Sequence, residues 1–151
     1  MAEVAEQWLA GSLYWTAPSV VLIAETLAES GNLTAGFDLV ESAIGAVKPE
    51  VEHWWTIEAY RARARLLSLL DARNSKEIEA DFETAIELAR THGAKSLELR
   101  AESNFVDYMQ SHGNHAASVA RLQLIYDWFT EGFDSHDHAN ARRVLQSSGN
   151  A

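Results

Sequence analysis

The stretch Leu124-Ile-Tyr-Asp-Trp-Phe-Thr-Glu-Gly-Phe-Asp134 ends an amphipathic pattern on a glycine. Apolar side chains within it and just before it recur every three or four residues, so they share one face of a helix and cannot share one face of a strand: Val119, Leu122, Ile125, Tyr126 and Phe129. The pattern predicts a helix over residues 115–131 with Gly132 as its C-terminal cap.

The same spacing recurs in three earlier stretches. They are Leu33, Phe37, Val40, Ile44 and Val47; Trp55, Ala59, Ala62, Leu66 and Leu69; and Ile78, Phe82, Ala85, Ile86 and Ala89. No stretch alternates apolar and polar residues as a half-buried strand would. The sequence therefore predicts an all-α protein.

Glycines and prolines divide these patterns into short-linked segments. We expect helices over residues 3–13, 18–30, 33–47, 52–71, 75–92, 95–112, 115–131 and 136–147. A length of 151 residues fits one domain over residues 1–151. Within it we expect an N-terminal helix and linker at 1–17, three helix pairs at 18–131 and a C-terminal capping helix at 136–147.

The turns between the predicted helices repeat. Asn32, Asn74 and Asn114 each stand between two helices, and they lie 42 and 40 residues apart. A period near 40 is longer than the roughly 34 residues of an ideal tetratricopeptide repeat and is typical of irregular helix-pair repeats. The pattern predicts a tetratricopeptide-like α-solenoid of about three antiparallel helix pairs with terminal capping helices.

Composition limits the class of partner. The chain has 12 Lys and Arg against 22 Asp and Glu, a formal net charge of −10, and no cysteine. This balance opposes nucleic acid and anionic membranes as partners, and the absence of cysteine excludes disulfides and fits a reducing compartment. The acidic N-terminus is unlike a secretion signal, and the longest apolar run, Val20–Ala24, is too short to span a bilayer. We expect a cytoplasmic protein.

Four ordered stretches resemble a known family: residues 54–67, 82–90, 94–101 and 126–134. Together they resemble the C-terminal tetratricopeptide-like region of large bacterial signalling proteins, in which a class III adenylate cyclase or a DNA-binding module precedes an ATPase and a helical tail. The resemblance covers residues 18–147. The family pattern usually has a glycine where this chain has Ala64, and often an aromatic residue where it has Met109.

The resemblance implies a helical regulatory tail and carries no enzymatic activity to this chain, because the cyclase and ATPase segments are missing. The chain is either an excised tail or a free-standing relative. Gly31-Asn-Leu-Thr-Ala-Gly36 has the two glycines of a phosphate loop but continues with Phe37-Asp38 and lacks its lysine. We expect no enzyme and no cofactor.

Histidines near two turns raise the question of a metal site. His112 and His115 flank one turn, whereas His136 and His138 follow Gly132, with Asp134 and Asp137 nearby. On a helix, residues 136 and 138 point about 200° apart and cannot chelate one ion, whereas an extended segment would place them on the same side. We favour solvated histidines at helix ends over a metal site.

The concave face of such a stack is the candidate binding site. The first helix of each pair lines that face, which places Glu25 and Glu29 there, followed by the residues expected to bind a partner: Glu58, Arg61, Arg65, Arg100, Ser103 and Asp107. Arg61 and Arg65 stand one turn apart and could hold a carboxylate such as a peptide C-terminus. Alternatively, they are ordinary solvated or intrahelical pair-forming charges.

Aromatic residues suggest two further alternatives. Trp54 and Trp55 can supply one core residue and one half-exposed residue, whereas Trp8, Leu13 and Trp15 lie at an end that would otherwise be bare. We expect a non-catalytic protein–protein interaction or regulatory module that binds a protein or peptide segment. The alternatives are a sensor that binds a small ligand between helix layers and a self-assembling module, such as a homodimer, formed through the Trp-rich end.

Overall fold

The computed structural model describes residues 19–45, 54–70, 74–111 and 115–149, and every regular element in them is an α-helix. The prediction of an all-α protein is therefore confirmed. The N-terminal self-association residues Trp8, Leu13 and Trp15, and the predicted helix over 3–13, lie outside the described residues. The helices are the first described helix (residues 19–29), α2 (Leu33–Gly45), α3 (Trp54–Leu70), α4 (Ser75–Thr91), α5 (Lys95–Gln110), α6 (Ala116–Trp128) and α7 (His136–Ser148).

The turn after α4 shows how the helices end. Gly93 has φ 65°, and the Ala94 N–H donates to the Ala89 carbonyl over 2.8 Å. This hydrogen bond satisfies a carbonyl at the end of the helix, and the left-handed backbone it needs suits glycine. The turn after the first described helix uses the same geometry, with Gly31 at φ 90°. Both breaks were predicted from glycine.

The end of α6 differs from the prediction. The helix ends at Trp128, not at residue 131, because Phe129 adopts an extended backbone with φ −76° and ψ 133°. Gly132, at φ 74°, lies within the following loop and does not cap the helix. Ser135 then caps α7, and its side chain accepts a hydrogen bond from the His138 N–H.

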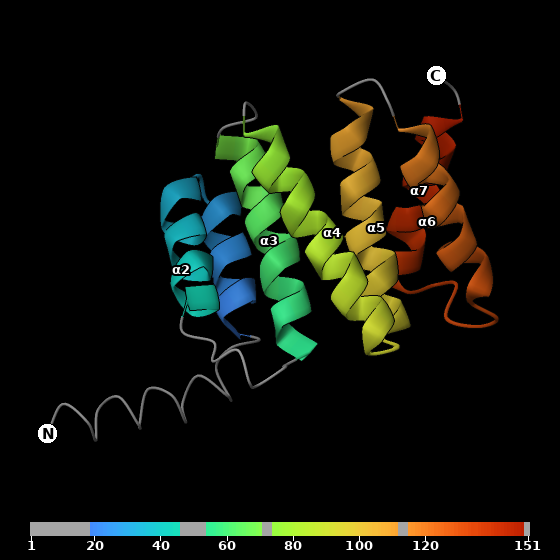
Figure 1. Ribbon diagram of the computed structural model, residues 1–151, viewed down its shortest axis with the longest axis horizontal. Helices are drawn as coiled ribbons and strands as arrows, with labels where there is room; N and C mark the ends of the chain where they lie inside the picture. The colour runs from blue at the N-terminus through green and yellow to red at the C-terminus, as the bar shows by residue number, and fades with distance from the viewer. Residues whose placement is uncertain (1–18, 46–53, 71–73, 112–114, 150–151) are drawn as a thin grey trace, which may run out of the picture.

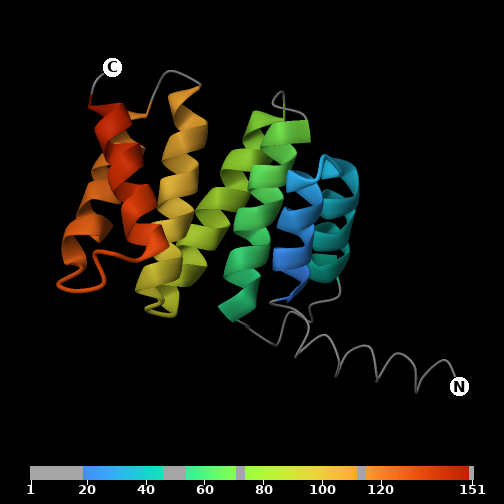
Figure 2. The same cartoon turned by 180° about the vertical axis from the view of Figure 1, so that it is seen from behind.

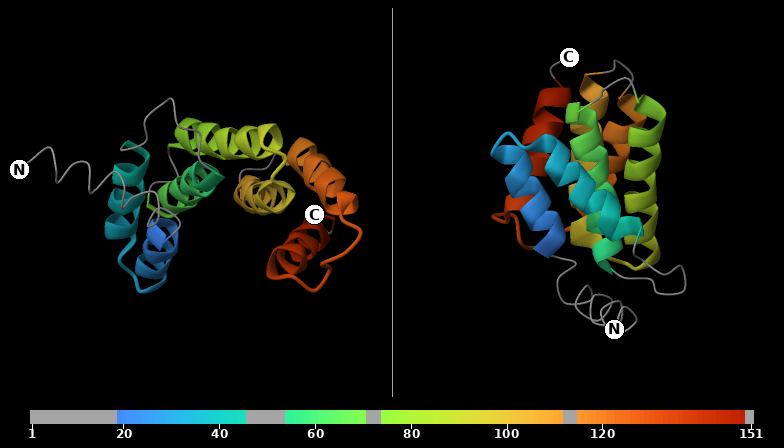
Figure 3. Two further views of the ribbon diagram at one scale, coloured as in Figure 1. Left: turned by 90° about the horizontal axis from the view of Figure 1, so that it is seen from below. Right: turned by 90° about the vertical axis from the view of Figure 1, so that its left-hand side faces the viewer.

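Consecutive helices run in opposite directions and lie side by side (Figure 1). Viewed from one end of the helices, they follow an arc (Figure 3). The first described helix, α3, α5 and α7 lie on the inner side of the arc, and α2, α4 and α6 lie on the outer side. Figure 2 shows the molecule from the side on which the first described helix and α7 lie near the viewer.

The core is divided along the arc. One buried cluster joins the first described helix, α2 and α3; a second joins α3, α4 and α5; a third joins α5, α6 and α7. Gly36 permits a close approach of α2 to the first described helix, since a Cβ there would lie 2.6 Å from the Ala24 carbonyl oxygen. Trp55 is buried and Trp54 is 56% exposed, as predicted for this pair.

Candidate functional site

The inner side of the arc forms a polar groove of about 550 Å³, here called the inner groove. Four arginines and four carboxylates line it, so its charge is nearly balanced although the whole chain carries −10. The groove therefore does not share the acidic character of the rest of the surface. Its lining residues are Glu25, Glu29, Arg61, Arg65, Arg100, Asn104, Asp107, His136, Asp137, Asn140 and Arg143.

Arg61 is the centre of the groove's hydrogen-bond network. Its side chain is buried, and its nitrogens donate to Glu25 and Glu58 over 3.1 to 3.2 Å and to the Asn104 amide oxygen over 2.9 Å. These contacts join the first described helix, α3 and α5. A guanidinium has five N–H donors, and each is used here within the protein. Arg61 is a structural cross-link of the groove floor.

Arg100 extends the network to α7. Its Nε and Nη2 donate to the two oxygens of Asp137 over 2.9 and 2.7 Å, which is a bidentate pair. Its Nη1 donates to Glu58 over 2.8 Å. Glu58 thus accepts hydrogen bonds from both Arg61 and Arg100. All four inner helices are joined by side-chain contacts in the groove.

The carboxylate of Glu25 occupies the position that the sequence suggested for a partner's carboxylate. Its Oε1 accepts from Arg61 over 3.1 Å and from Arg65 over 2.9 Å. Burial raises the pKa of Glu25, but the positive charges of Arg61 and Arg65 and their hydrogen bonds outweigh burial and lower the pKa below its ordinary value. Arg61 and Arg65 therefore bind a carboxylate together, as suggested, but that carboxylate is the side chain of Glu25 in this same chain.

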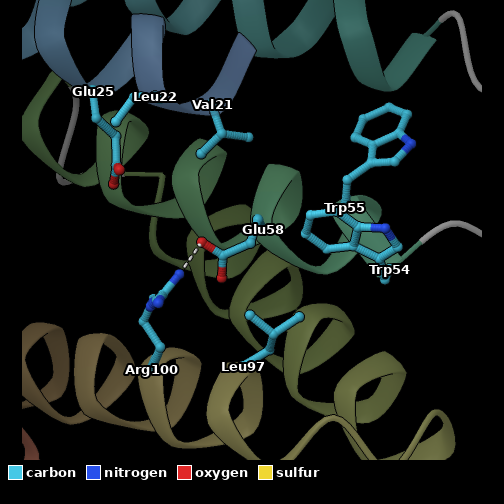
Figure 4. A pocket seen from close by; sticks show the side chains of 8 residues that line it. All are labelled: Val21, Leu22, Glu25, Trp54, Trp55, Glu58, Leu97 and Arg100. Carbon is cyan, nitrogen blue, oxygen red and sulfur yellow. Dashed lines mark hydrogen bonds and ion pairs between the residues drawn. The ribbon is translucent and has the colours of Figure 1, made fainter. Parts of the chain in front are cut away.

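An apolar pocket of about 240 Å³ adjoins the inner groove and shares Glu25 and Arg100 with it. Figure 4 shows the pocket, with apolar side chains around the Glu58–Arg100 ion pair. The pocket draws on the first described helix, α3 and α5. Its other lining residues are Val21, Leu22, Trp54, Trp55 and Leu97.

The residues predicted to bind a partner lie in three different places in the structure: the inner groove, the adjoining pocket and the core. Arg61, Arg65, Arg100 and Asp107 line the inner groove, and Glu58 lines the adjoining pocket. Ser103 does not reach the groove, which corrects the prediction: its side chain is fully buried and donates to the Leu99 carbonyl over 2.7 Å.

Sequence reasoning missed the contribution of α7, because this helix was expected only to cap the stack. Three polar residues on one face of α7 line the groove: Asp137, Asn140 and Arg143. Asn104 adds an amide from α5. These α7 positions are three residues apart, and this spacing could have shown that they share one face of the helix.

The histidines at the start of α7 face different surroundings. His136 has a side chain 96% exposed, whereas His138 is 1% exposed. No group of three potential metal ligands is present among the described residues. Nor does any helix within residues 19–45, 54–70, 74–111 and 115–149 have the length and apolar character needed to cross a bilayer.

Arg65 and Arg143 are the most exposed of the four groove arginines. The side chain of Arg65 is 43% exposed and that of Arg143 is 57% exposed. Each holds one carboxylate of the groove, through Glu25 and Asp107 respectively. They are the cations that a molecule entering the groove would meet. Comparison with family models, with curated proteins and with solved structures finds no match to this chain.

Proposed function

We propose that the chain is a single-domain, non-catalytic interaction module of tetratricopeptide-like type, which binds a protein or peptide segment along the inner groove. The observation that carries this proposal is the inner groove itself, a charge-balanced face continuous with an apolar pocket. Such a combination suits peptide recognition, in which an apolar anchor supplies affinity and polar contacts fix orientation. The resemblance to helical tails of bacterial signalling proteins supports a regulatory role. The absence of cysteine supports a location in the cytoplasm.

In this proposal the ligand has two recognition elements. A carboxylate of the segment meets the exposed donors of Arg65 and Arg143, and an apolar side chain enters the pocket between Leu22, Trp54 and Leu97. The groove floor, held by Arg61, stays fixed while the segment binds. A preformed floor reduces the ordering cost of binding.

Selection from a random-peptide display library tests the proposal. Selected peptides should bind the wild-type chain and lose about tenfold or more in affinity for the double variant Arg65→Gln/Arg143→Gln, since two charge-assisted contacts are removed. Lys76→Gln on outer helix α4 is the charge control and should bind like wild type. Equal affinity for the double variant would reject the groove as the site.

Self-association is a second candidate function that a specific observation favours. Leu22 is 68% exposed and Trp54 is 56% exposed at the N-terminal end of the arc. Exposed apolar side chains that lie together mark interaction surfaces. Light-scattering mass over a range of concentrations separates this function from a monomeric adaptor, and a dimer that Trp54→Ala dissociates would place the interface at this end.

A further inference from the structure

The outer helix at the C-terminal end of the arc, α6, differs from the other two outer helices in what it exposes (Figure 3). The exposed positions of α2 and α4 are mostly polar or charged. Those of α6 are mostly apolar, and the side chains of Leu124 and Trp128 are 76% and 58% exposed. The exposed residues of α6 are Ala116, Ala117, Ala120, Gln123, Leu124, Asp127 and Trp128.

Four of these residues form one apolar stripe, here called the α6 stripe, because they are three or four positions apart: Ala117, Ala120, Leu124 and Trp128. The opposite face of the helix is apolar as well and packs into the core through Leu122 and Ile125. A helix with apolar residues on both faces is typically buried on both. Here only one face is covered, so the α6 stripe is an interaction surface.

The charge of α6 suits contact with a second copy of the chain. The helix contains one arginine and one aspartate, so it is neutral, whereas the whole chain carries −10. Arg121 is already paired with the carboxylates of Glu83 and Glu102. Two copies of an acidic chain repel each other. Among the outer helices, the neutral and apolar α6 is the one on which they can meet with the least repulsion.

The order of side chains along α6 is self-complementary. Small residues occupy the first half of the exposed face, and large ones occupy the second half. Positions 116 and 128 are equally far from residue 122, and so are positions 120 and 124. In an antiparallel pair of α6 helices centred there, Leu124 lies opposite the partner's Ala120, and Trp128 lies opposite the partner's Ala116. Large side chains thus meet small ones, and a two-fold axis repeats each contact.

We propose that the α6 stripe binds the same stripe of a second copy of this chain, which forms an antiparallel two-fold dimer. The two Asp127 carboxylates stand at opposite ends of the pair, about 15 Å apart along the helix axis, so they do not oppose association. The Lys95 ammonium lies 5.8 Å from the centroid of the Trp128 ring, and its charge is already paired with Glu98 over 2.8 Å. The exposed remainder of the indole is available to the partner.

The dimer is expected to be weak. Each α6 helix has 13 residues, and a contact of this length belongs to the small interfaces of transient complexes, so we expect a Kd on the order of 0.1 mM. The inference does not rest on the proposed function, because α6 lies on the outer side of the arc and leaves both inner grooves open (Figure 3). The stripe also lies at the opposite end of the arc from Leu22 and Trp54 (Figure 1).

Sedimentation equilibrium of the full chain, from about 10 µM to about 1 mM, measures the dimer. The average mass should rise from that of a monomer toward twice that value. NMR of the ¹⁵N-labelled chain over the same range places the contact. The amides of residues 116–128 and the Trp128 indole N–H should shift with concentration, whereas the amides of α2 should not.

The first variant pair compares two exposed leucines at opposite ends of the arc. Leu124→Glu puts a carboxylate into the apolar contact twice, so it should raise the dimer Kd by about tenfold or more. Leu22→Glu adds the same charge to the chain at a leucine that is 68% exposed, and it should leave the Kd unchanged. Equal effects of the two variants, or a larger effect of Leu22→Glu, would reject the α6 stripe.

The second variant pair tests self-complementarity. Ala120→Leu makes the surface more apolar but fills the space that the partner's Leu124 needs, so it should raise the Kd by about fivefold or more. Ala80→Leu, at an exposed alanine of α4, is the control and should have no effect. Tighter association of Ala120→Leu would show an unspecific apolar surface and overturn the proposal. A wild-type chain that stays monomeric throughout the concentration range would overturn it as well.

Discussion

Arg61 and His138 are both buried polar residues of the inner helices, but their hydrogen bonding differs. Every nitrogen of Arg61 donates to a side chain of this protein. Neither nitrogen of His138 has a partner among the described residues. A satisfied buried group fixes the positions of its neighbours, whereas an unsatisfied one keeps its hydrogen-bonding capacity. The groove floor is thus held by a satisfied network, whereas His138 carries the cost of unmet hydrogen bonds within an aromatic cluster.

The largest effect is expected from breaking the satisfied network. Arg61→Met leaves Glu25 and Glu58 as poorly solvated carboxylates without their central cation, so the free energy of unfolding should fall by about 3 to 5 kcal/mol. Urea unfolding followed by circular dichroism measures the loss. Arg65→Met is the control: the side chain of Arg65 is 43% exposed, and its loss should cost less than about 1 kcal/mol. Equal losses would show that Arg61 is not the cross-link.

Glu102 provides an intermediate case, because it is only partly satisfied. One oxygen accepts from Arg90 over 2.7 Å, while burial raises the pKa of Glu102 to about 7 despite the opposing charges of Arg121 and Arg90. The native state therefore holds this proton more tightly than the unfolded chain does. Its contribution to stability is fully present below pH 4.5, the ordinary pKa, and is lost as pH rises through about 7.

The wild-type chain should thus lose on the order of 3 kcal/mol through this group across that interval. Glu102→Gln removes the titration, so its free energy of unfolding should lack this fall with pH. Urea unfolding at a series of pH values compares the two proteins, with Glu87→Gln as the control for a surface carboxylate. A fall as steep in Glu102→Gln as in wild type would contradict the assignment.

A smaller effect is expected for the contact between Arg100 and Asp137, which joins α5 to α7. The side chains are 37% and 19% exposed, so water screens the pair. A double-mutant cycle with Arg100→Met and Asp137→Asn should give a coupling free energy of about 1 kcal/mol. No measurable coupling in thermal or urea unfolding would mean that the pair does not hold α7 against the groove.

The smallest effect on stability is expected at His138. His138→Phe removes two unbonded nitrogens from an aromatic cluster, so the free energy of unfolding should stay unchanged or rise by up to about 1 kcal/mol. Thermal unfolding of the variant and of the wild-type chain measures this directly. A loss of more than about 1 kcal/mol would mean that the imidazole stabilises the fold.

The helices, and which side of each one faces the core, could be predicted because the 3.6-residue period of apolar side chains is a local property of the sequence. That is why Arg65, Arg100 and Asp107 were correctly projected onto the inner side, where the groove lies. Ser103 was projected there as well, but its side chain is buried. It lies beside the positions of α5 that face the groove, where the helix already packs against its neighbours.

The pairing of side chains could not be predicted, because it depends on contacts between distant segments. Arg61 meets Glu25 from 36 residues away, and Arg100 meets Asp137 from 37 residues away. The burial of His138 likewise depends on how the loop after Trp128 folds, and the pattern wrongly continued the helix into that loop as far as residue 131.

Mapping where a selected peptide binds tests the central proposal, that the inner groove is a recognition surface. The chain, labelled with ¹⁵N, is titrated with the tightest peptide from the display selection, and the side-chain amide signals of Asn104 and Asn140 are followed by NMR. We predict that these signals shift in step with binding and that signals from α2, α4 and α6 change little. Shifts confined to those outer helices, with Asn104 and Asn140 unmoved, would contradict the account.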